Sequence, residues 1–256
     1  MKSIAHFASI TALFSAFILC SASATERYFT YTYEPETMPQ GLCEYEQWVT
    51  YRTHTANDHS FTSIDFRHEF EMGITDNFDL RVYLPSWRYE DTDEHAGTRF
   101  GSIDVEGVAY LSNPVTDRVG LALYNEVRVG EDELAFEHKL LVQKDIGKWI
   151  LLYNLVLETE IEGVFNGGEE NEVKGVLGHT MGVGYAVAPG WFLGAEGVVE
   201  SVFEDWSDYK HTTVYAGPVL SYQADRWWAT VTPVYQLSDV EDESDFQLRL
   251  IFGLTF

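Results

Sequence analysis

Acidic side chains recur at every second position in several stretches of the chain, and this spacing could line a polar pathway. Glu158 and Glu160 are separated by one residue, and the same alternation runs from Asp65 to Glu71. Successive side chains of a strand point to opposite faces, so each set shares one face. A hydrated face of carboxylates attracts cations or positively charged solutes. The candidate lumen-lining residues are Asp65, Arg67, Glu69, Glu71, Arg81, Asp104, Glu106, Glu126, Glu137, Glu158, Glu160, Glu196, Glu200 and Arg249.

The same pattern also has a purely structural explanation. Arginines and lysines such as Arg128 and Lys139 fall on the same faces as the carboxylates and could pair with them. Side chains just fill the interior of a barrel of about eight strands, and the interior widens as strands are added. At about twelve strands, a conducting acidic lumen and a lumen closed by its own charge network both remain open.

The elements that must position these faces are strands, and the last one is the clearest. In Asp245 to Phe256, apolar residues occupy every second position, and Gln247, Arg249, Gly253 and Thr255 lie between them, which is the period of a strand with one apolar face. This closing strand, ending on Phe256, resembles the C-terminal signature of Gram-negative outer-membrane β-barrels. The resemblance implies that the barrel-insertion machinery recognises the strand and that it pairs with the first strand. The apolar residues are Phe246, Leu248, Leu250, Phe252, Leu254 and Phe256.

Alternation and turn residues predict twelve strands in all. After the first 24 residues no apolar run reaches the roughly 20 residues that a spanning helix needs. A membrane protein without such helices must be a closed barrel, because open backbone cannot face lipid. The predicted fold is all-β, a single transmembrane antiparallel up-and-down β-barrel of about 12 strands, with a charged loop at 88–98. The predicted strands are 44–53, 61–73, 78–84, 99–111, 119–129, 134–145, 149–161, 173–187, 191–203, 211–222, 227–237 and 245–256.

Charge and the N-terminal residues predict the location. Lys2, an apolar run and Ala22-Ser23-Ala24 predict a signal peptide over 1–24, a periplasmic arm over 25–43 and the barrel over 44–256. Cys20 raises a lipoprotein alternative, which the bulky Leu19 before it disfavours. The formal charge of −25 disfavours binding to nucleic acid. We therefore expect a protein of the outer membrane of a Gram-negative bacterium.

A second resemblance lies in the early hairpin. The runs Phe66 to Asp76 and Asp79 to Pro85 resemble poorly characterised barrels labelled transporter-like, some found beside aromatic-degradation genes. This implies a passive channel or transporter-like protein for small solutes. The alternatives are a non-conducting structural barrel, a lipid-modifying barrel enzyme, and a soluble periplasmic ligand-binding barrel. Expected partners are outer-membrane lipid and lipopolysaccharide, whose phosphates the acidic loops could contact through divalent cations. Simple solvation of those loops is the competing interpretation.

No catalytic motif supports the enzyme alternative. The sequence contains no G-x-S-x-G, H-E-x-x-H or Walker A pattern. Lipid-modifying barrel enzymes bring a His and a Ser together, and the nearest candidates here are His59-Ser60 and His179-Thr180. We expect no enzyme activity, no cofactor and no resident metal.

Three histidines interrupt the predicted lipid-facing stripe, as does Asn125, which the predicted register places opposite His138. One interpretation is an intersubunit or lipid-headgroup contact. The one we favour is a local bulge that turns these side chains inward. The histidines are His68, His138 and His179.

Overall fold

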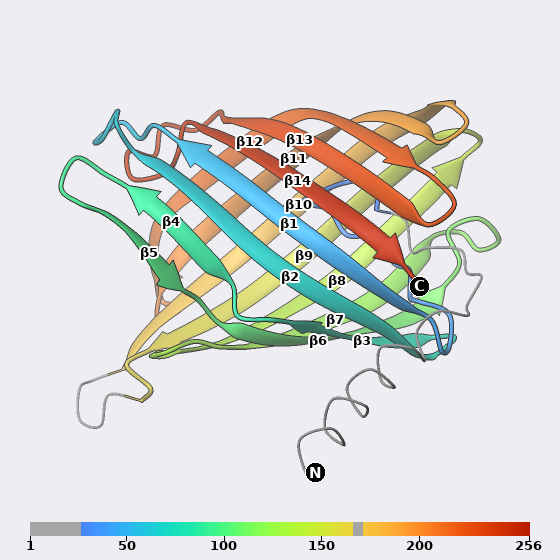
Figure 1. The fold of residues 1–256 in the computed structure, drawn as a ribbon, viewed down its shortest axis with the longest axis horizontal. Coiled ribbons are helices and arrows are strands. Elements are labelled where there is room, and N and C mark those ends of the chain that lie inside the picture. The colour runs from blue at the N-terminus through green and yellow to red at the C-terminus, as the bar shows by residue number, and fades with distance from the viewer. Residues whose placement is uncertain (1–26, 166–170) are drawn as a thin grey trace, which may run out of the picture.

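The computed structural model describes residues 27–165 and 171–256, and within them the regular elements are antiparallel strands of one sheet (Figure 1). The signal peptide predicted for 1–24 lies outside the described residues. Among the described residues, no helix is both long enough and apolar enough to span a bilayer. The strands are β1 Cys43–Thr53, β2 Thr62–Thr75, β3 Phe78–Tyr83, β4 Trp87–Asp91, β5 Ala96–Phe100, β6 Ile103–Ser112, β7 Gly120–Val129, β8 Glu133–Ile146, β9 Trp149–Glu162, β10 Glu172–Ala188, β11 Trp191–Glu204, β12 Asp208–Gln223, β13 Trp227–Gln236 and β14 Phe246–Thr255.

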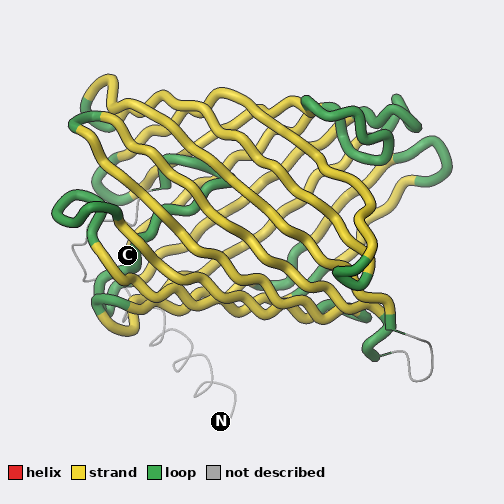
Figure 2. Tube along the Cα trace, turned by 180° about the vertical axis from the view of Figure 1, so that it is seen from behind, coloured by secondary structure: helices red, strands yellow, loops and turns green. Residues whose placement is uncertain are grey.

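The sheet closes into a ring of twelve strands. β1 pairs with β2 on one edge and with β14 on the other, so the first and last strands of the chain meet. Leu254 lies opposite Tyr45, and the backbone N–H of Phe256 donates to the carbonyl oxygen of Cys43 at 3.0 Å. Seen from behind, the ring is a continuous wall of tilted strands (Figure 2). The predicted twelve-stranded up-and-down barrel and its closing strand are confirmed.

The two ends of the barrel differ in their connections. At the end where β14 finishes, the turns are short, such as 76–77, 147–148 and 189–190. The opposite end carries longer connections, such as 54–61 and 237–245. Short turns face the periplasm in bacterial barrels and longer loops face outward, which orients the ring. The predicted connection at 204–210 is shorter than expected, since only 205–207 separate β11 from β12.

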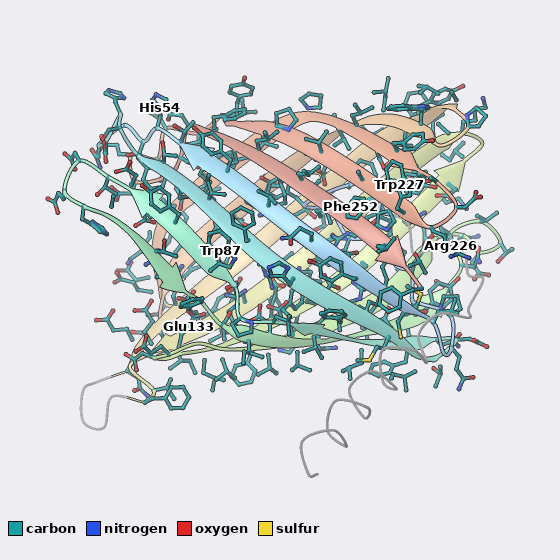
Figure 3. All side chains as sticks on the ribbon, viewed as in Figure 1. His54, Trp87, Glu133, Arg226, Trp227 and Phe252 are labelled. Atoms are coloured by element: carbon teal, nitrogen blue, oxygen red, sulfur yellow. The ribbon has the colours of Figure 1, made fainter. Side chains whose placement is uncertain are left out.

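The outer face of the ring carries apolar and aromatic side chains (Figure 3). Near the short turns, the ring of Trp227 lies 5.3 Å from that of Tyr222 and 6.0 Å from that of Phe252. Trp149 and Trp191 are 49% and 45% exposed at the same end. Such an aromatic belt marks the level of the membrane interface.

Two strands extend the ring at its extracellular end, where we expected a charged loop at 88–98. Pro85 interrupts the chain after β3. β3 pairs with the C-terminal half of β2, and β4 then pairs with its N-terminal half. Trp87 of β4 stacks on Phe66 of β2, with ring centroids 4.1 Å apart. Residues 87–91 thus pair with the edge of β2, and β4 and β5 form a hairpin. The strand predicted from 99 therefore begins at Ile103.

The described part of the predicted periplasmic arm, 25–43, lies inside the barrel. We call residues 27–42 the N-terminal segment. Phe29 and Met38 are fully buried, and polar groups of the segment bind lumen side chains. The expectation of an arm outside the barrel is wrong because the lumen supplies partners for this backbone.

The favoured bulge at the outward histidines is also wrong. The strand alternation continues through each position, so the rings stay on the outer face and each meets a polar neighbour there. Mutual hydrogen bonding offsets the cost of placing polar groups at an apolar surface. The pairs are Tyr45 Oη with His68 Nδ1 at 2.7 Å, Asn125 Oδ1 with His138 Nδ1 at 2.8 Å, and Tyr153 Oη with His179 Nδ1 at 2.8 Å.

Candidate functional site

The predicted lumen residues lie on the inner face of the ring, and many of them form rows across it. Within each row, neighbours are direct partners in the strand register. Because the strands tilt, a row starting at the periplasmic end of β1 reaches the outer half of β9. One row consists of Glu44, Glu71, Arg81, Glu106, Glu126, Glu137 and Glu158. A second contains Glu46, Glu69, Tyr83, Asp104, Arg128, Ala135 and Glu160.

At the periplasmic end, the inner face is densely acidic and fully buried. Arg81 lies among four carboxylates, with nitrogen to oxygen distances of 3.0 Å to Glu106, 3.2 Å to Asp79, 3.4 Å to Glu71 and 3.8 Å to Glu69. None of these five side chains is more than 7% exposed. One cation therefore contacts several carboxylates in this half of the lumen.

Toward the extracellular end, cations and carboxylates are more evenly matched. Asp65 pairs with both Arg52 and Arg88, and each pair joins neighbouring strands. Lys139 Nζ lies 2.7 Å from Glu137. Further pairs are Arg67 with Asp104 at 2.6 Å, Arg128 with Glu158 at 3.0 Å and Lys174 with Glu160 at 3.5 Å. The predicted residues here are held in a charge network.

Glu196 holds the N-terminal segment in the lumen. Its carboxylate accepts hydrogen bonds from the backbone N–H groups of Tyr31 and Thr32, both at 2.8 Å. The N–H and hydroxyl of Thr30 donate to it as well, at 3.0 and 3.1 Å, and the Thr232 hydroxyl donates at 2.8 Å. Five donors thus surround a side chain that is 2% exposed. Glu196 therefore binds the N-terminal segment and is buried from solvent.

Asn154 makes a second attachment. Its amide exchanges two hydrogen bonds with the backbone of Tyr33, and the Thr180 hydroxyl donates to its Oδ1 at 3.1 Å. Tyr33 in turn lies beneath Arg27, whose guanidinium carbon is 3.9 Å from the ring centroid. Asn154 interrupts an apolar run in the sequence. This interruption is the sequence feature that indicates a special role for Asn154.

Glycines on β10 and β11 make room for the segment. A Cβ at Gly182 would lie 2.8 Å from the ring of Phe29, and one at Gly194 would lie 3.3 Å from it. The Phe29 ring packs edge-on against Phe192, with centroids 5.4 Å apart. A glycine-rich inner face is therefore the second sequence signal that something other than strand side chains fills this part of the lumen.

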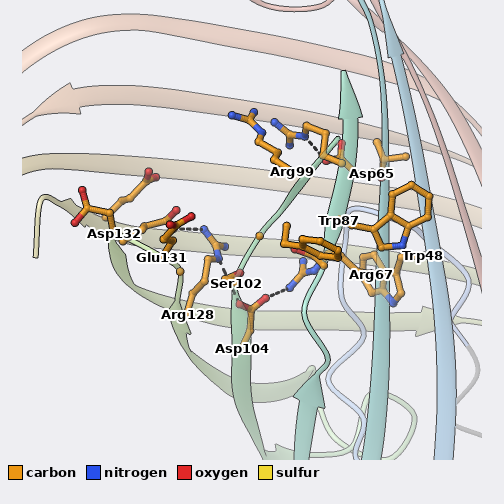
Figure 4. A pocket seen from close by; sticks show the side chains of 18 of the residues that line it. Trp48, Asp65, Arg67, Trp87, Arg99, Ser102, Asp104, Arg128, Glu131 and Asp132 are labelled. Carbon is orange, nitrogen blue, oxygen red and sulfur yellow. Dashed lines mark hydrogen bonds and ion pairs between the residues drawn. The ribbon is translucent and has the colours of Figure 1, made fainter. Parts of the chain in front are cut away.

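Two neighbouring cavities lie in the lumen. The larger, of about 710 Å³, lies at the extracellular end between the β4–β5 hairpin and the turn after β7 (Figure 4). The deeper one, of about 280 Å³, reaches Tyr31 and Tyr33 of the N-terminal segment. Both are lined by Trp48, Arg52, Arg67, Arg128 and Arg249. Sequence reasoning did not identify Arg52, which meets Asp65 across the β1–β2 pair, nor Trp87 and Arg88, because β4 was not predicted.

Arg249 and Glu200 differ from the other predicted residues. Both line the deeper cavity, and no ion pair within 4.0 Å involves either of them among the described residues. Arg249 instead donates to the Thr50 hydroxyl at 3.2 Å and lies 3.9 Å from the ring centroid of Tyr31. Their charges face the cavity.

The two His and hydroxyl candidates for catalysis do not form a site. His179 points outward to Tyr153, whereas Thr180 points inward to Asn154. Ser60 lies in an extracellular loop, where its hydroxyl donates to Asp58 at 2.6 Å.

Comparisons with known proteins support the same fold. The COG4313 outer membrane channel from Pseudomonas putida F1 is 14% identical with a TM-score of 0.68, and the match covers 89% of this chain and 100% of that chain. The NanC porin is 9% identical with a TM-score of 0.56, covering 82% and 98%. No curated protein matches the sequence.

The closed ring, its apolar exterior and the shared fold agree with the predicted barrel of the Gram-negative outer membrane. A family match covers residues 21–249, which is most of the chain. The chain therefore belongs to the family of unknown function DUF6662.

Proposed function

We propose that the protein is an outer-membrane channel for small polar solutes whose closed state is the one with the N-terminal segment in the lumen. Solute enters the larger cavity from outside, passes to the deeper cavity and stops at Tyr31 and Tyr33. Release of the segment from Glu196 and Asn154 then opens the way to the periplasm.

The observation that carries this proposal is that two neighbouring cavities lead from the extracellular end of the lumen to the segment. They share lining residues, and the deeper one ends on segment side chains. Its volume of about 280 Å³ is near the low end for small-molecule sites, which begin at about 300 Å³. A non-conducting barrel would need no such space behind its blocking segment.

The lining favours polar solutes with modest charge selectivity. Five cations and four carboxylates line the deeper cavity, so its wall is close to neutral. The excess of carboxylates expected from the sequence is concentrated around Arg81. We propose that the cation preference of the open channel is weak, and that solutes carrying both charges or none pass best. The residues are Arg52, Arg67, Arg128, Lys139 and Arg249 with Glu126, Glu137, Glu200 and Glu243.

Single-channel recording on purified, refolded protein in a planar bilayer tests the proposal. The wild-type barrel should show small, infrequent openings. A barrel that lacks residues 27–40 should conduct steadily, and liposomes containing it should swell in solutions of small sugars and amino acids. If the truncated barrel folds, as shown by heat-modifiable gel mobility, and still carries no current, the protein is a structural barrel.

A further inference from the structure

Four carboxylates on β1 and β2 gather at the periplasmic end of the lumen, and we call them the carboxylate cluster. They are Glu44, Glu46, Glu69 and Glu71, none more than 1% exposed. Glu44 lies directly opposite Glu71 in the register, and Glu46 lies opposite Glu69. One oxygen atom from each of Glu44, Glu46 and Glu71 lies within 4.8 Å of the others. That span is twice a Ca²⁺–oxygen distance of about 2.4 Å.

The cations around the cluster do not balance its charge. Asp79 and Glu106 adjoin it through Arg81, which makes six buried carboxylates in this half of the lumen. Among the described residues, the cations within 4.0 Å of them are Arg81 and, for Glu46, Arg27 at 3.7 Å. An uncompensated buried charge costs several kcal/mol. Additional positive charge must enter this region as metal ions or as protons.

Glu69 is the independent sign of a missing ligand. It is completely buried, and neither of its oxygens has a hydrogen-bond donor among the described residues. Its closest cation is the Arg81 Nε, at 3.8 Å. As the register partner of Glu46 on the same inner face, it points into the cluster. A buried carboxylate without a donor is rare unless something else binds it.

Fixed donors orient two of the other proposed ligands. Thr255 Oγ1 and Trp228 Nε1 donate to the two oxygens of Glu44, at 2.6 and 3.0 Å. Trp48 Nε1 donates to Glu46 at 2.7 Å. Such outer contacts orient metal ligands.

We propose that the carboxylate cluster binds one divalent cation, Ca²⁺, between β1 and β2 beneath the N-terminal segment. Ca²⁺ accepts six to eight oxygens in flexible geometry, which suits several carboxylates that bind through one or two oxygens. Mg²⁺ requires a compact octahedron and keeps its waters. The ion would fasten β2 to β1, the strand that also closes the ring on β14. Because the ligands are so deeply buried, the ion enters during folding and exchanges slowly afterwards.

The test is to refold the wild-type barrel in Ca²⁺, in Mg²⁺ or in chelator, remove free ions and measure bound metal and thermal unfolding. Wild type refolded in Ca²⁺ should retain about one ion per chain more than the E46Q/E71Q variant. Its unfolding midpoint should be roughly 5 °C above that of the chelator sample. Mg²⁺ should give a smaller rise.

Matched variants separate this site from other acidic groups. E200Q changes a lumen carboxylate outside the cluster and should keep both the ion and the stabilisation. Ca²⁺ bound weakly by the exposed acidic loops would be present in both the wild type and E46Q/E71Q. It therefore cancels in the difference between their metal contents. The single variant E69Q is a second readout if the double variant fails to refold, and its Ca²⁺ affinity should be at least tenfold lower. Equal metal content and equal midpoints in Ca²⁺ and chelator for the wild type would overturn the proposal and leave protons as the neutralising charge.

Discussion

Asn154 of β9 and Tyr33 of the N-terminal segment exchange two hydrogen bonds across 121 positions of the chain. The backbone N–H of Tyr33 donates to Asn154 Oδ1 at 2.7 Å, and Asn154 Nδ2 donates to the carbonyl oxygen of Tyr33 at 3.0 Å. The Asn154 amide thus makes the two backbone hydrogen bonds with Tyr33 that a neighbouring strand would otherwise make. The segment is held in the lumen by directed contacts as well as by apolar packing.

Replacing Asn154 with Leu should loosen the segment and make openings more frequent. The change leaves two buried backbone groups of Tyr33 without partners, each at a cost of about 1–3 kcal/mol. Single-channel recording gives the open fraction, and N125L is the control because Asn125 faces outward. Equal open fractions for the two variants would mean that this contact does not hold the closed state.

The substitution E196Q should destabilise the same closed state from β11. Gln keeps the size of Glu but loses the charge that strengthens hydrogen bonds to the segment, which are worth about 1.5–3 kcal/mol each. We expect the ratio of open to closed time to rise by about tenfold or more. The variant E200Q removes a carboxylate four residues further along the same face, where no hydrogen bond to the segment occurs among the described residues, and should leave this ratio unchanged.

Charge removal on β9 tests the assignment of faces. Glu158 lies 3.0 Å from Arg128 on the inner face, so E158Q/E160Q should leave Arg128 less compensated and shift selectivity toward anions. The reversal potential in a KCl gradient measures the shift, which should shrink at 1 M salt, where the Debye length is about 3 Å. Leu155 and Leu157 face outward, so L155Q/L157Q should impair insertion and leave selectivity unchanged in the barrels that form. The opposite pattern would contradict the register of β9.

The closing strand should govern assembly. Leu254 is 41% exposed on the outer face, and the backbone of Phe256 bonds to Cys43 at the seam. We propose that the insertion machinery reads this strand, so L254D/F256D or loss of Phe256 should leave the protein in the periplasm. A charge at the lipid face costs about 2–4 kcal/mol near the midplane. Membrane fractionation with heat-modifiable mobility measures the loss, and L254I with F256Y should insert normally.

Much of the barrel could be predicted from local sequence patterns. The two-residue period of β2, β9 and β14 already separates an outer from an inner face, because backbone geometry alone fixes that alternation. The pairing of Asn125 with His138 also followed, since a short connection sets the register of adjacent strands. These features needed no information from distant parts of the chain.

Ring closure and tertiary contacts decided the rest. The N-terminal segment finds its partners, Asn154 and Glu196, more than 100 residues away, so no local pattern placed it in the lumen. The outward histidines kept their places because a neighbouring strand offered each a polar partner. The same closure brings Thr255 of β14 opposite Glu44, whose partner on the other side is Glu71 of the adjacent β2. The sequence by itself determined which residues face inward, whereas which of those meet depended on the strand tilt and on the long-range pairing that closes the ring.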